Sequence, residues 1–456
     1  MAEKKISQLT AKGATVADTD LLVVSESAGG GTYVTKSVTG ANIKALVTDA
    51  NLTTSDITTN NVSTTKHGFA PKLPGNTTTF LRGDGTYATP ASGGLTEFTE
   101  LETTAAPNAT VPVNSLTPVT ATTNADVAIV PKGNGAFMLD IPDNTATGGN
   151  KRGQYAVDLQ MTRSNAGNIA SGNYSFNAGQ DSYATGTASF AFGNSYATNT
   201  SAIAMGNSTA SGANSVALGG GSATAQYAFA GGASTASGQR SATFGLSNTS
   251  SGISSFTTGQ SNTASGWMSA SLGESNVSSG YSSMSFGNSN TSNSDYSTTL
   301  GYYAHVFGVY GRQSYASGRE STNGDSQGSK FILRERTTGN TATTLTSDSG
   351  AAGAANQVIL SNQSAYRFKG TIVGKQSGSV NAAVWDVDGF IVRGANAAAT
   401  TLNVSNVTLV QNTPAWGTPT LAADTTNGGL QVQVTGAAAT NIQWTAVIET
   451  TEVIYA

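Results

Sequence analysis

The centre of this chain is an internal repeat in which glycine returns at every thirteenth or fourteenth position. The repeat is marked by Gly179, Gly193, Gly206, Gly219, Gly232, Gly245, Gly259, Gly273, Gly287 and Gly301. A second mark stands seven residues before each of these positions and is glycine in seven of the ten coils. So short a period holds two short strands and two tight corners, and glycine tolerates the left-handed backbone angles that tight corners need. The repeat therefore predicts a β-roll of about ten stacked coils.

Side chains between the two marks alternate in size. Larger residues fall two apart in Phe190 and Phe192, Ile203 and Met205, Val216 and Leu218, and Met284 and Phe286, with Ala191, Ala204, Ala217 and Ser285 between them. A period of two predicts strands that each bury one face. Coils stacked about 4.8 Å apart would form a rod on the order of 50 Å long. Two apolar positions per coil make a thin core, so we infer that the roll completes its core by packing against copies of itself.

Composition supports an ordered roll and excludes several other classes of protein. A Gly/Ser-rich disordered linker is the alternative, but linkers do not keep one phase over ten units. Only four residues of 170–301 are charged, namely Asp181, Arg240, Glu274 and Asp295. The net charge of −4 argues against a strongly basic nucleic-acid binder. Because the chain has no cysteine, disulfides, thiolate metal sites and cysteine nucleophiles are excluded.

The flanking segments differ from the roll and from each other. Residues 1–50 read as a small attachment domain, with a hairpin over 21–26 and 33–38 and a short helix that carries Ile43 and Leu46 and is capped by Thr39. Residues 51–125 are rich in Thr, Asn and Pro and are predicted to be extended. Residues 126–169 form a small β connector, with strands near 127–130 and 137–139. The roll occupies 170–315. We expect no export signal, because the N-terminus has no apolar region and no small-residue cleavage site, and no membrane span, because no stretch reaches about 18 apolar residues.

Residues 316–456 are predicted to form a separate β-head. The candidate strands are 330–337, 357–361, 365–375, 382–393, 401–412, 430–435 and 441–454. Leu430, Val432 and Val434 share one face, as do Ile442, Trp444, Ala446 and Ile448. Such alternation with turn signals between the strands is typical of an antiparallel β-sandwich.

The repeat resembles a known family. ATGTASFAFG at 184–193 and ASGANSVALG at 210–219 look like the head repeat of trimeric autotransporter adhesins of the YadA type. The resemblance implies a left-handed parallel β-roll that keeps this short repeat, and three chains packed into one trimer. It extends over the low-charge segment, 170–301.

The flanks resemble bacteriophage tail fibres instead. The segments that carry this resemblance are KISQLTA at 5–11, SVTGANIKAL at 37–46, TTKHGFAPKLPGNTTTFLRGDGTYATP at 64–90, DVAIVPKGNGAFMLDIPD at 126–143 and LTSDSGAAGAANQVIL at 345–360. Together the resemblances imply an elongated homotrimer. Its N-terminus would attach to a tail or baseplate protein of the virion, and its C-terminal head would meet a glycan or protein of the host surface. The chain would be made in the host cytoplasm and reside in the virion tail.

One acid pair has a possible chemical role. Asp386 and Asp388 are two residues apart on a predicted strand, next to Trp385. Two carboxylates on one face suit acid–base cleavage of a glycosidic bond, or a cation site beside an aromatic sugar platform. The other interpretation is an ordinary solvated strand face. His305, just past the repeats, would come near its copies in a trimer and could hold an axial ion, although packing at the roll exit is the simpler interpretation. We expect no cofactor and no catalytic activity.

Aromatic side chains of the head are the candidates for receptor contact, since rings stack on sugar faces and supply large contact areas. The candidate receptor residues are Trp416, Trp385, Tyr366, Phe390, Asp386 and Asp388. Trp416 is the first choice, because the prolines at 414 and 419 predict a loop around it, whereas Trp444 is predicted to be core. The hypothesis is a non-catalytic tail fibre that binds through three identical heads. The alternatives are a tailspike that cleaves capsule or lipopolysaccharide, a bacterial surface adhesin, and an ice-binding or structural solenoid.

Overall fold

The computed structural model describes residues 17, 19–27, 30–31, 33–45, 78–84, 86–89, 98–103, 113–119, 124 and 126–455. The chain forms two compact units, residues 1–128 and residues 129–456. The five-part division expected from the sequence is finer than this and stays a prediction. Among the described residues, no helical segment has the length and hydropathy of a membrane span.

The described residues of the first unit form three hairpins. Strand β1 (Leu21–Ser27) pairs antiparallel with β2 (Tyr33–Thr39), as predicted. Helix α1 (Gly40–Ala45) follows, and the Asn42 amide donates to Thr39 Oγ1 at 3.2 Å, which confirms the predicted cap. Strands β3 (Phe80–Leu81) and β4 (Tyr87–Ala88) form the second hairpin, and β5 (Phe98–Thr103) and β6 (Val113–Pro118) form the third. Leu46, His67 and the motif at 5–11 lie outside the described residues.

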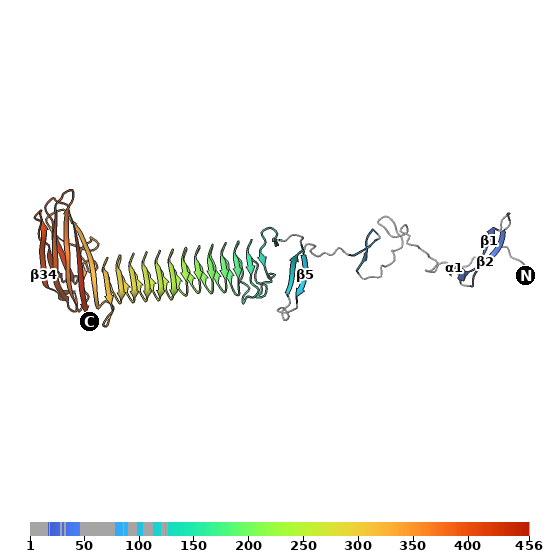
Figure 1. The fold of residues 1–456 in the computed structure, drawn as a ribbon, viewed down its shortest axis with the longest axis horizontal. Helices are drawn as coiled ribbons and strands as arrows, with labels where there is room; N and C mark the ends of the chain where they lie inside the picture. The colour runs from blue at the N-terminus through green and yellow to red at the C-terminus, as the bar shows by residue number, and fades with distance from the viewer. Residues whose placement is uncertain are drawn as a thin grey trace. The chain divides into compact units, whose positions relative to one another are not determined.

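The second unit begins with the predicted roll, which consists of two parallel sheets (Figure 1). The first sheet contains β9 (Phe176–Ala178), β11 (Phe190–Phe192), β13 (Ile203–Met205), β15 (Val216–Leu218), β17 (Phe229–Gly231), β19 (Ala242–Leu246), β21 (Phe256–Gln260), β23 (Ala270–Glu274), β25 (Met284–Asn288) and β27 (Thr298–Tyr302). The second contains β10 (Tyr183–Ala184), β12 (Tyr196–Ala197), β14 (Thr209–Ala210), β16 (Ser222–Ala223), β18 (Thr235–Ala236), β20 (Thr249–Ser250), β22 (Thr263–Ala264), β24 (Val277–Ser278) and β26 (Thr291–Ser292). The chain is thus all-β, with a parallel solenoid at its centre.

The interior of the roll is built from small side chains. Ala191, Ala204 and Ala217 are fully buried between the sheets, and they pair in register from coil to coil. The larger residues beside them point outward, so Phe192 and Met205 remain exposed in a single chain. The coils also stack closely at their corners. A methyl group on Gly280, for example, would lie 2.0 Å from the Ser294 carbonyl oxygen of the next coil.

Polar ladders replace hydrophobic packing in the coils nearest the head. Asn262 accepts at Oδ1 from the backbone and side-chain nitrogens of Asn276, each at 3.0 Å. The Asn276 side chain donates in turn to the carbonyls of Leu272 at 2.9 Å and Gly287 at 2.7 Å. Equivalent bonds join Asn248 to Asn262 and Asn276 to Asn290. Each buried amide is therefore satisfied by its neighbouring coils, as buried polar groups must be.

The stack starts earlier than predicted. Strands β7 (Phe137–Met138) and β8 (Val157–Leu159) pair in parallel with each other, and β8 pairs with β9, so the connector already belongs to the first sheet. The predicted strand at 127–130 is wrong, because this run lies exposed and unpaired within the described residues. A buried ion pair between Arg152 Nε and Asp158 at 2.6 Å lies at this end of the stack.

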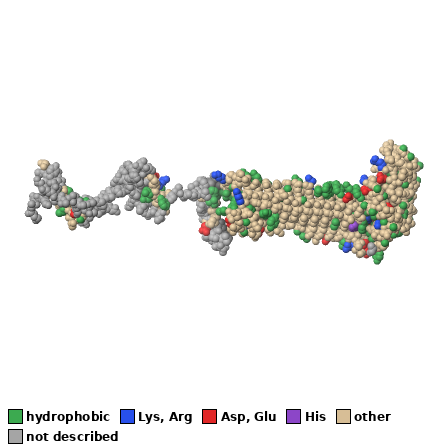
Figure 2. All heavy atoms as spheres, turned by 180° about the vertical axis from the view of Figure 1, so that it is seen from behind, with side chains coloured by type: hydrophobic (Ala, Val, Ile, Leu, Met, Phe, Trp, Pro, Cys, Tyr) green, Lys and Arg blue, Asp and Glu red, His purple; other side chains and the backbone are tan. Residues whose placement is uncertain are grey.

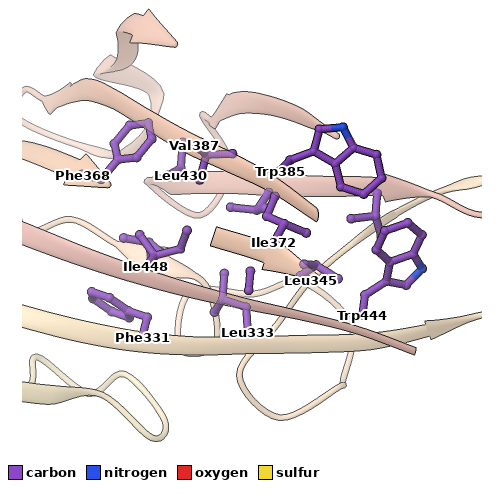
Figure 3. Packing of buried hydrophobic residues seen from close by; sticks show 14 of the residues in the cluster. Phe331, Leu333, Leu345, Phe368, Ile372, Trp385, Val387, Leu430, Trp444 and Ile448 are labelled. Atoms are coloured by element: carbon purple, nitrogen blue, oxygen red, sulfur yellow. The ribbon is translucent and has the colours of Figure 1, made fainter. Parts of the chain in front are cut away.

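The head is an antiparallel sandwich, as predicted. Its large sheet has the order β29 (Ser326–Thr337), β37 (Ile442–Ile454), β32 (Ser364–Gln376), β33 (Ala382–Arg393) and β34 (Thr400–Asn412). Its small sheet contains β30 (Ala342–Thr344), β36 (Gly429–Thr435), β31 (Val358–Ile359) and β35 (Thr420–Asp424). Between the sheets lies the core, in which Trp385, Phe368 and Ile372 pack above Leu333 and Trp444 (Figure 3).

One strand connects the roll to the head. Strand β28 (Gln313–Ser317) pairs in parallel with β27 of the roll and antiparallel with β29 of the head. The outward face of the first roll sheet therefore continues directly onto the outer face of the large head sheet.

Candidate functional site

Three predicted receptor residues are core residues. Trp416 is only 6 % exposed, and Trp385 and Tyr366 are buried almost completely. Asn412 holds the Trp416 loop against the core, since it accepts from the Trp416 amide at 2.9 Å and donates to its carbonyl at 2.7 Å. The Trp416 ring then packs edge-on against Trp444, with ring centroids 5.5 Å apart. The first choice for a receptor contact is therefore wrong, whereas the core position of Trp444 is confirmed.

Tyr366 and Trp385 are corrected for the same physical reason. Both face the small sheet, and burial raises the pKa of the Tyr366 hydroxyl to about 12. Trp385 precedes Asp386 on β33, so its ring points to the opposite face from the two carboxylates. Trp385 is therefore not the aromatic sugar platform predicted beside the acid pair.

The acid pair itself lies where the sequence places it. Asp386 and Asp388 are on the outer face of β33, with the buried Val387 between them. Phe390, half-buried, continues the same face. Asp386 accepts from Thr371 Oγ1 at 2.9 Å, and Asp388 pairs with Arg367 Nη2 at 2.7 Å. The structure thus brings together three of the six predicted residues.

Four charged residues and one asparagine form a row across this face. The strand register places Lys330, Glu449, Lys369, Asp388 and Asn406 side by side on β29, β37, β32, β33 and β34. Lys369 Nζ lies 3.4 Å from Glu449, and Asn406 donates to Asp388 at 3.3 Å. The row is solvated, so these pairs contribute little to stability and leave their polar atoms available to a ligand.

Two open hollows lie on the outer face of the sheet. One, of about 430 Å³, is lined by Asp386, Asp388 and Glu449 together with Lys369 and Thr371. The other, of about 530 Å³, is lined by Arg336 and Lys375 among neutral residues. An acidic hollow and a basic hollow thus share one sheet face. Figure 2 shows acidic and basic side chains gathered on the head, in contrast to the roll.

His305 has no ligand geometry around it. Its ring contacts Phe307, whose amide donates to His305 Nδ1 at 2.7 Å. No cluster of three or more metal-ligating side chains occurs among the described residues. Packing at the roll exit is the arrangement that the structure shows for this histidine.

Comparisons with known proteins give distant structural neighbours. No protein-family model matches, and neither does any curated protein. Among solved structures, the tailspike protein gp49 of the Acinetobacter baumannii bacteriophage Fri1, a capsular polysaccharide depolymerase, is 10% identical over 78% of this chain and 75% of its own, with a TM-score of 0.20. The tailspike of Acinetobacter phage vB_ApiP_P1 is also 10% identical, over 71% of this chain and 80% of its own, with a TM-score of 0.19.

The described activity of the first neighbour contradicts the expectation that this chain is not an enzyme, and that expectation is withdrawn. The likeness at these TM-scores is slight.

Proposed function

We propose that the chain is a phage tailspike that binds a polysaccharide of the host surface and cleaves its glycosidic bonds. The observation that carries the proposal is the pair of carboxylates, Asp386 and Asp388, which share an open hollow on the head with Glu449. The sequence resemblance to tail fibres supports a position of this head at the host-facing end of a virion tail protein.

The spacing of the two carboxylates suits cleavage with inversion. Alternate residues of a strand lie about 7 Å apart, because each residue advances the strand by about 3.3 Å. Inverting glycosidases hold their two carboxyl groups about 6.5–9.5 Å apart, which leaves room for a water molecule. The backbone spacing of Asp386 and Asp388 falls inside that range. Glu449, two strands from Asp388, is about 9.6 Å away along the hydrogen-bonding direction and is the second possible partner.

The reaction requires only the polysaccharide and water. One carboxylic acid protonates the oxygen of the leaving sugar as its bond to the anomeric carbon breaks. The other carboxylate removes a proton from water, whose oxygen forms the new bond to that carbon from the opposite side. Thr371 and Arg367 orient the two carboxylates through their hydrogen bonds.

The basic hollow next to the acidic one supports a charged substrate. Arg336 and Lys375 would pair with acidic groups on neighbouring sugars of the same chain, while the carboxylates act on the bond between them. The substrate class that fits this face is therefore an acidic capsular or lipopolysaccharide chain.

We also propose that the working form is a homotrimer, with the N-terminal segment bound to the virion. Apolar side chains stand in register along the outside of the first roll sheet, as in Phe192, Met205, Phe244 and Leu300, and remain exposed in the single chain. Exposed columns of this kind mark a protein contact. Because this face continues onto the large head sheet, assembly would place the acidic hollow beside a neighbouring copy.

The test is release of oligosaccharide from purified bacterial capsules and lipopolysaccharides, measured as new reducing ends. Asp386→Asn and Asp388→Asn should each lower the rate by about 100-fold or more, the usual effect of losing a general acid or base. Glu320→Gln, on an exposed loop, is the matched control and should have no effect. Undiminished release in both aspartate variants would exclude this pair as the catalytic groups.

A further inference from the structure

Four aromatic rings form a continuous row along one corner of the roll. Trp267, Tyr281, Tyr296 and Tyr310 come from successive coils, and neighbouring ring centroids are 6.4, 5.4 and 5.2 Å apart. Trp267 is 55% exposed and Tyr296 is 51% exposed. The row leads from the last coils to the head, where the Tyr310 amide donates to the Ala355 carbonyl at 2.8 Å. Figure 2 shows hydrophobic side chains gathered on the coils just before the head.

The roll does not need these rings for its own fold. In other coils the position equivalent to Tyr296 carries small residues, such as Ser201, Asn214 and Ser254, with the same left-handed backbone. Trp267 and Tyr281 stand one position earlier in their coils, where other coils carry Thr187, Thr200 and Ala213. Because coils fold without aromatic residues at these positions, we infer that the four rings have a function other than coil stacking.

Polar groups lie at the head end of the row. Asp295 Oδ1 accepts a hydrogen bond from the Tyr281 amide at 2.8 Å. The backbone carbonyl of Asp295 accepts another from the amide of Gly311, which follows Tyr310, at 2.9 Å. Burial raises the pKa of Tyr310, and Asp348 and Asp295 contribute to the rise, so both carboxylates lie near this ring. Exposed carboxylates next to flat rings provide hydrogen-bond acceptors beside stacking faces.

We propose that this aromatic row is a second carbohydrate site, which binds an extended polysaccharide chain along the roll. Ring faces pack on the apolar faces of successive sugars, while tyrosine hydroxyls donate or accept hydrogen bonds and the Asp295 and Asp348 carboxylates accept them from sugar hydroxyls. The inference rests on the proposed function for its ligand class. It adds that the roll itself holds substrate and delivers the chain toward the head.

Tryptophan fluorescence gives a direct test, because Trp267 is the only exposed tryptophan of the four, all of which the structure describes. The probe is an array of purified capsular polysaccharides and lipopolysaccharide O-chains, followed by acrylamide quenching of the full-length protein with the polysaccharide that it binds. The bound polysaccharide should shield Trp267 from acrylamide. Trp267→Ala and Tyr296→Ala should each weaken binding by about fivefold or more, the loss expected for an aromatic anchor.

Tyr227→Ala is the matched control. Tyr227 has the same exposure of 51% as Tyr296 and the same left-handed backbone, but it lies outside the row. Thermal unfolding should be alike in all three variants. Equal affinity of all variants for the polysaccharide would overturn the proposal. So would shielding of Trp267 from acrylamide in the absence of polysaccharide, because the aromatic row would then contact another copy of the chain. Failure of the catalytic proposal gives a different result. In that case the Asp386→Asn and Asp388→Asn variants would still release oligosaccharide, and the aromatic row would still bind polysaccharide. Binding to no polysaccharide at all would overturn both proposals.

Discussion

Arg312 and Glu452 form a fully buried ion pair between the end of the roll and the last strand of the head. Ser329 Oγ accepts from Arg312 Nε at 3.1 Å, and Gln327 and Thr450 donate to Glu452 at 2.9 and 2.6 Å. The guanidinium also lies 5.1 Å from the centre of the Phe331 ring. The pair joins residues that are 140 positions apart in the sequence, so it fixes the head on the roll.

Removing one partner should therefore destabilise the junction strongly. Glu452→Gln leaves the Arg312 charge buried without a counter-charge, and we expect a loss of about 3–5 kcal/mol in the free energy of unfolding. Denaturant titration followed by circular dichroism measures it. Lys369→Met, which breaks the exposed pair with Glu449, is the control and should change stability by less than about 1 kcal/mol. Equal effects of the two variants would contradict the assignment.

His305 should make the same junction sensitive to acid. Burial, with a smaller contribution from the Arg312 guanidinium, lowers the pKa of His305 to about 4. An unfolded histidine titrates near about 6.5, so the unfolded chain binds more protons between about pH 6.5 and 4. Stability is then complete above about pH 6.5 and falls as the pH drops toward about 4, by on the order of 3 kcal/mol.

His305→Gln removes that dependence. Its free energy of unfolding should vary less with pH between about 6.5 and 4 than that of the unchanged protein, although carboxylates contribute a slope in both. Denaturant midpoints measured across this range give the difference. An identical slope in the two proteins would mean that His305 titrates normally.

The sequence predicts the coil boundaries well but not the side of the strand that is buried. Glycine phase locates each corner, because a methyl group on Gly280 or Gly252 would meet the backbone of the next coil at 2.0 or 1.9 Å. Alternation of Phe190, Ala191 and Phe192 distinguishes two faces, yet either could be inside. The choice depends on the distance between two sheets that are made by different parts of each coil. No single strand carries that information.

The Asn ladder shows a signal that was present in the sequence and missed. Asn248, Asn262, Asn276 and Asn290 each stand three residues after a repeat glycine, and only in coils of the longer spacing. Repeated asparagine at one phase predicts a stacked amide ladder as readily as glycine predicts a corner. The burial of the Trp416 side chain had no comparable signal in the sequence. Prolines on both sides predict a loop but do not determine the direction in which the tryptophan side chain points.

Asn276→Asp should break this ladder. A carboxylate cannot donate to the Leu272 and Gly287 carbonyls, and it would be buried without a cation, so a loss of more than about 3 kcal/mol is expected. Asn293→Asp is the control, since the exposed Asn293 uses only its Oδ1, as an acceptor from the Gly308 amide. Thermal unfolding should separate the two variants clearly, and similar melting temperatures would argue against the ladder.

The outward apolar columns of the roll predict that the protein is a trimer in solution. Phe192 and Phe244 belong to one column of the first sheet and are exposed in the single chain. If three rolls pack through this sheet, the protein in solution should have three times the chain mass of 46.0 kDa by light scattering after size-exclusion chromatography. Phe192→Glu combined with Phe244→Glu buries charges in that contact and should yield single chains or aggregates. Thr224→Glu, an exposed change just past β16 of the second sheet, should leave the trimer intact. A single-chain mass for the unchanged protein would refute the trimer outright.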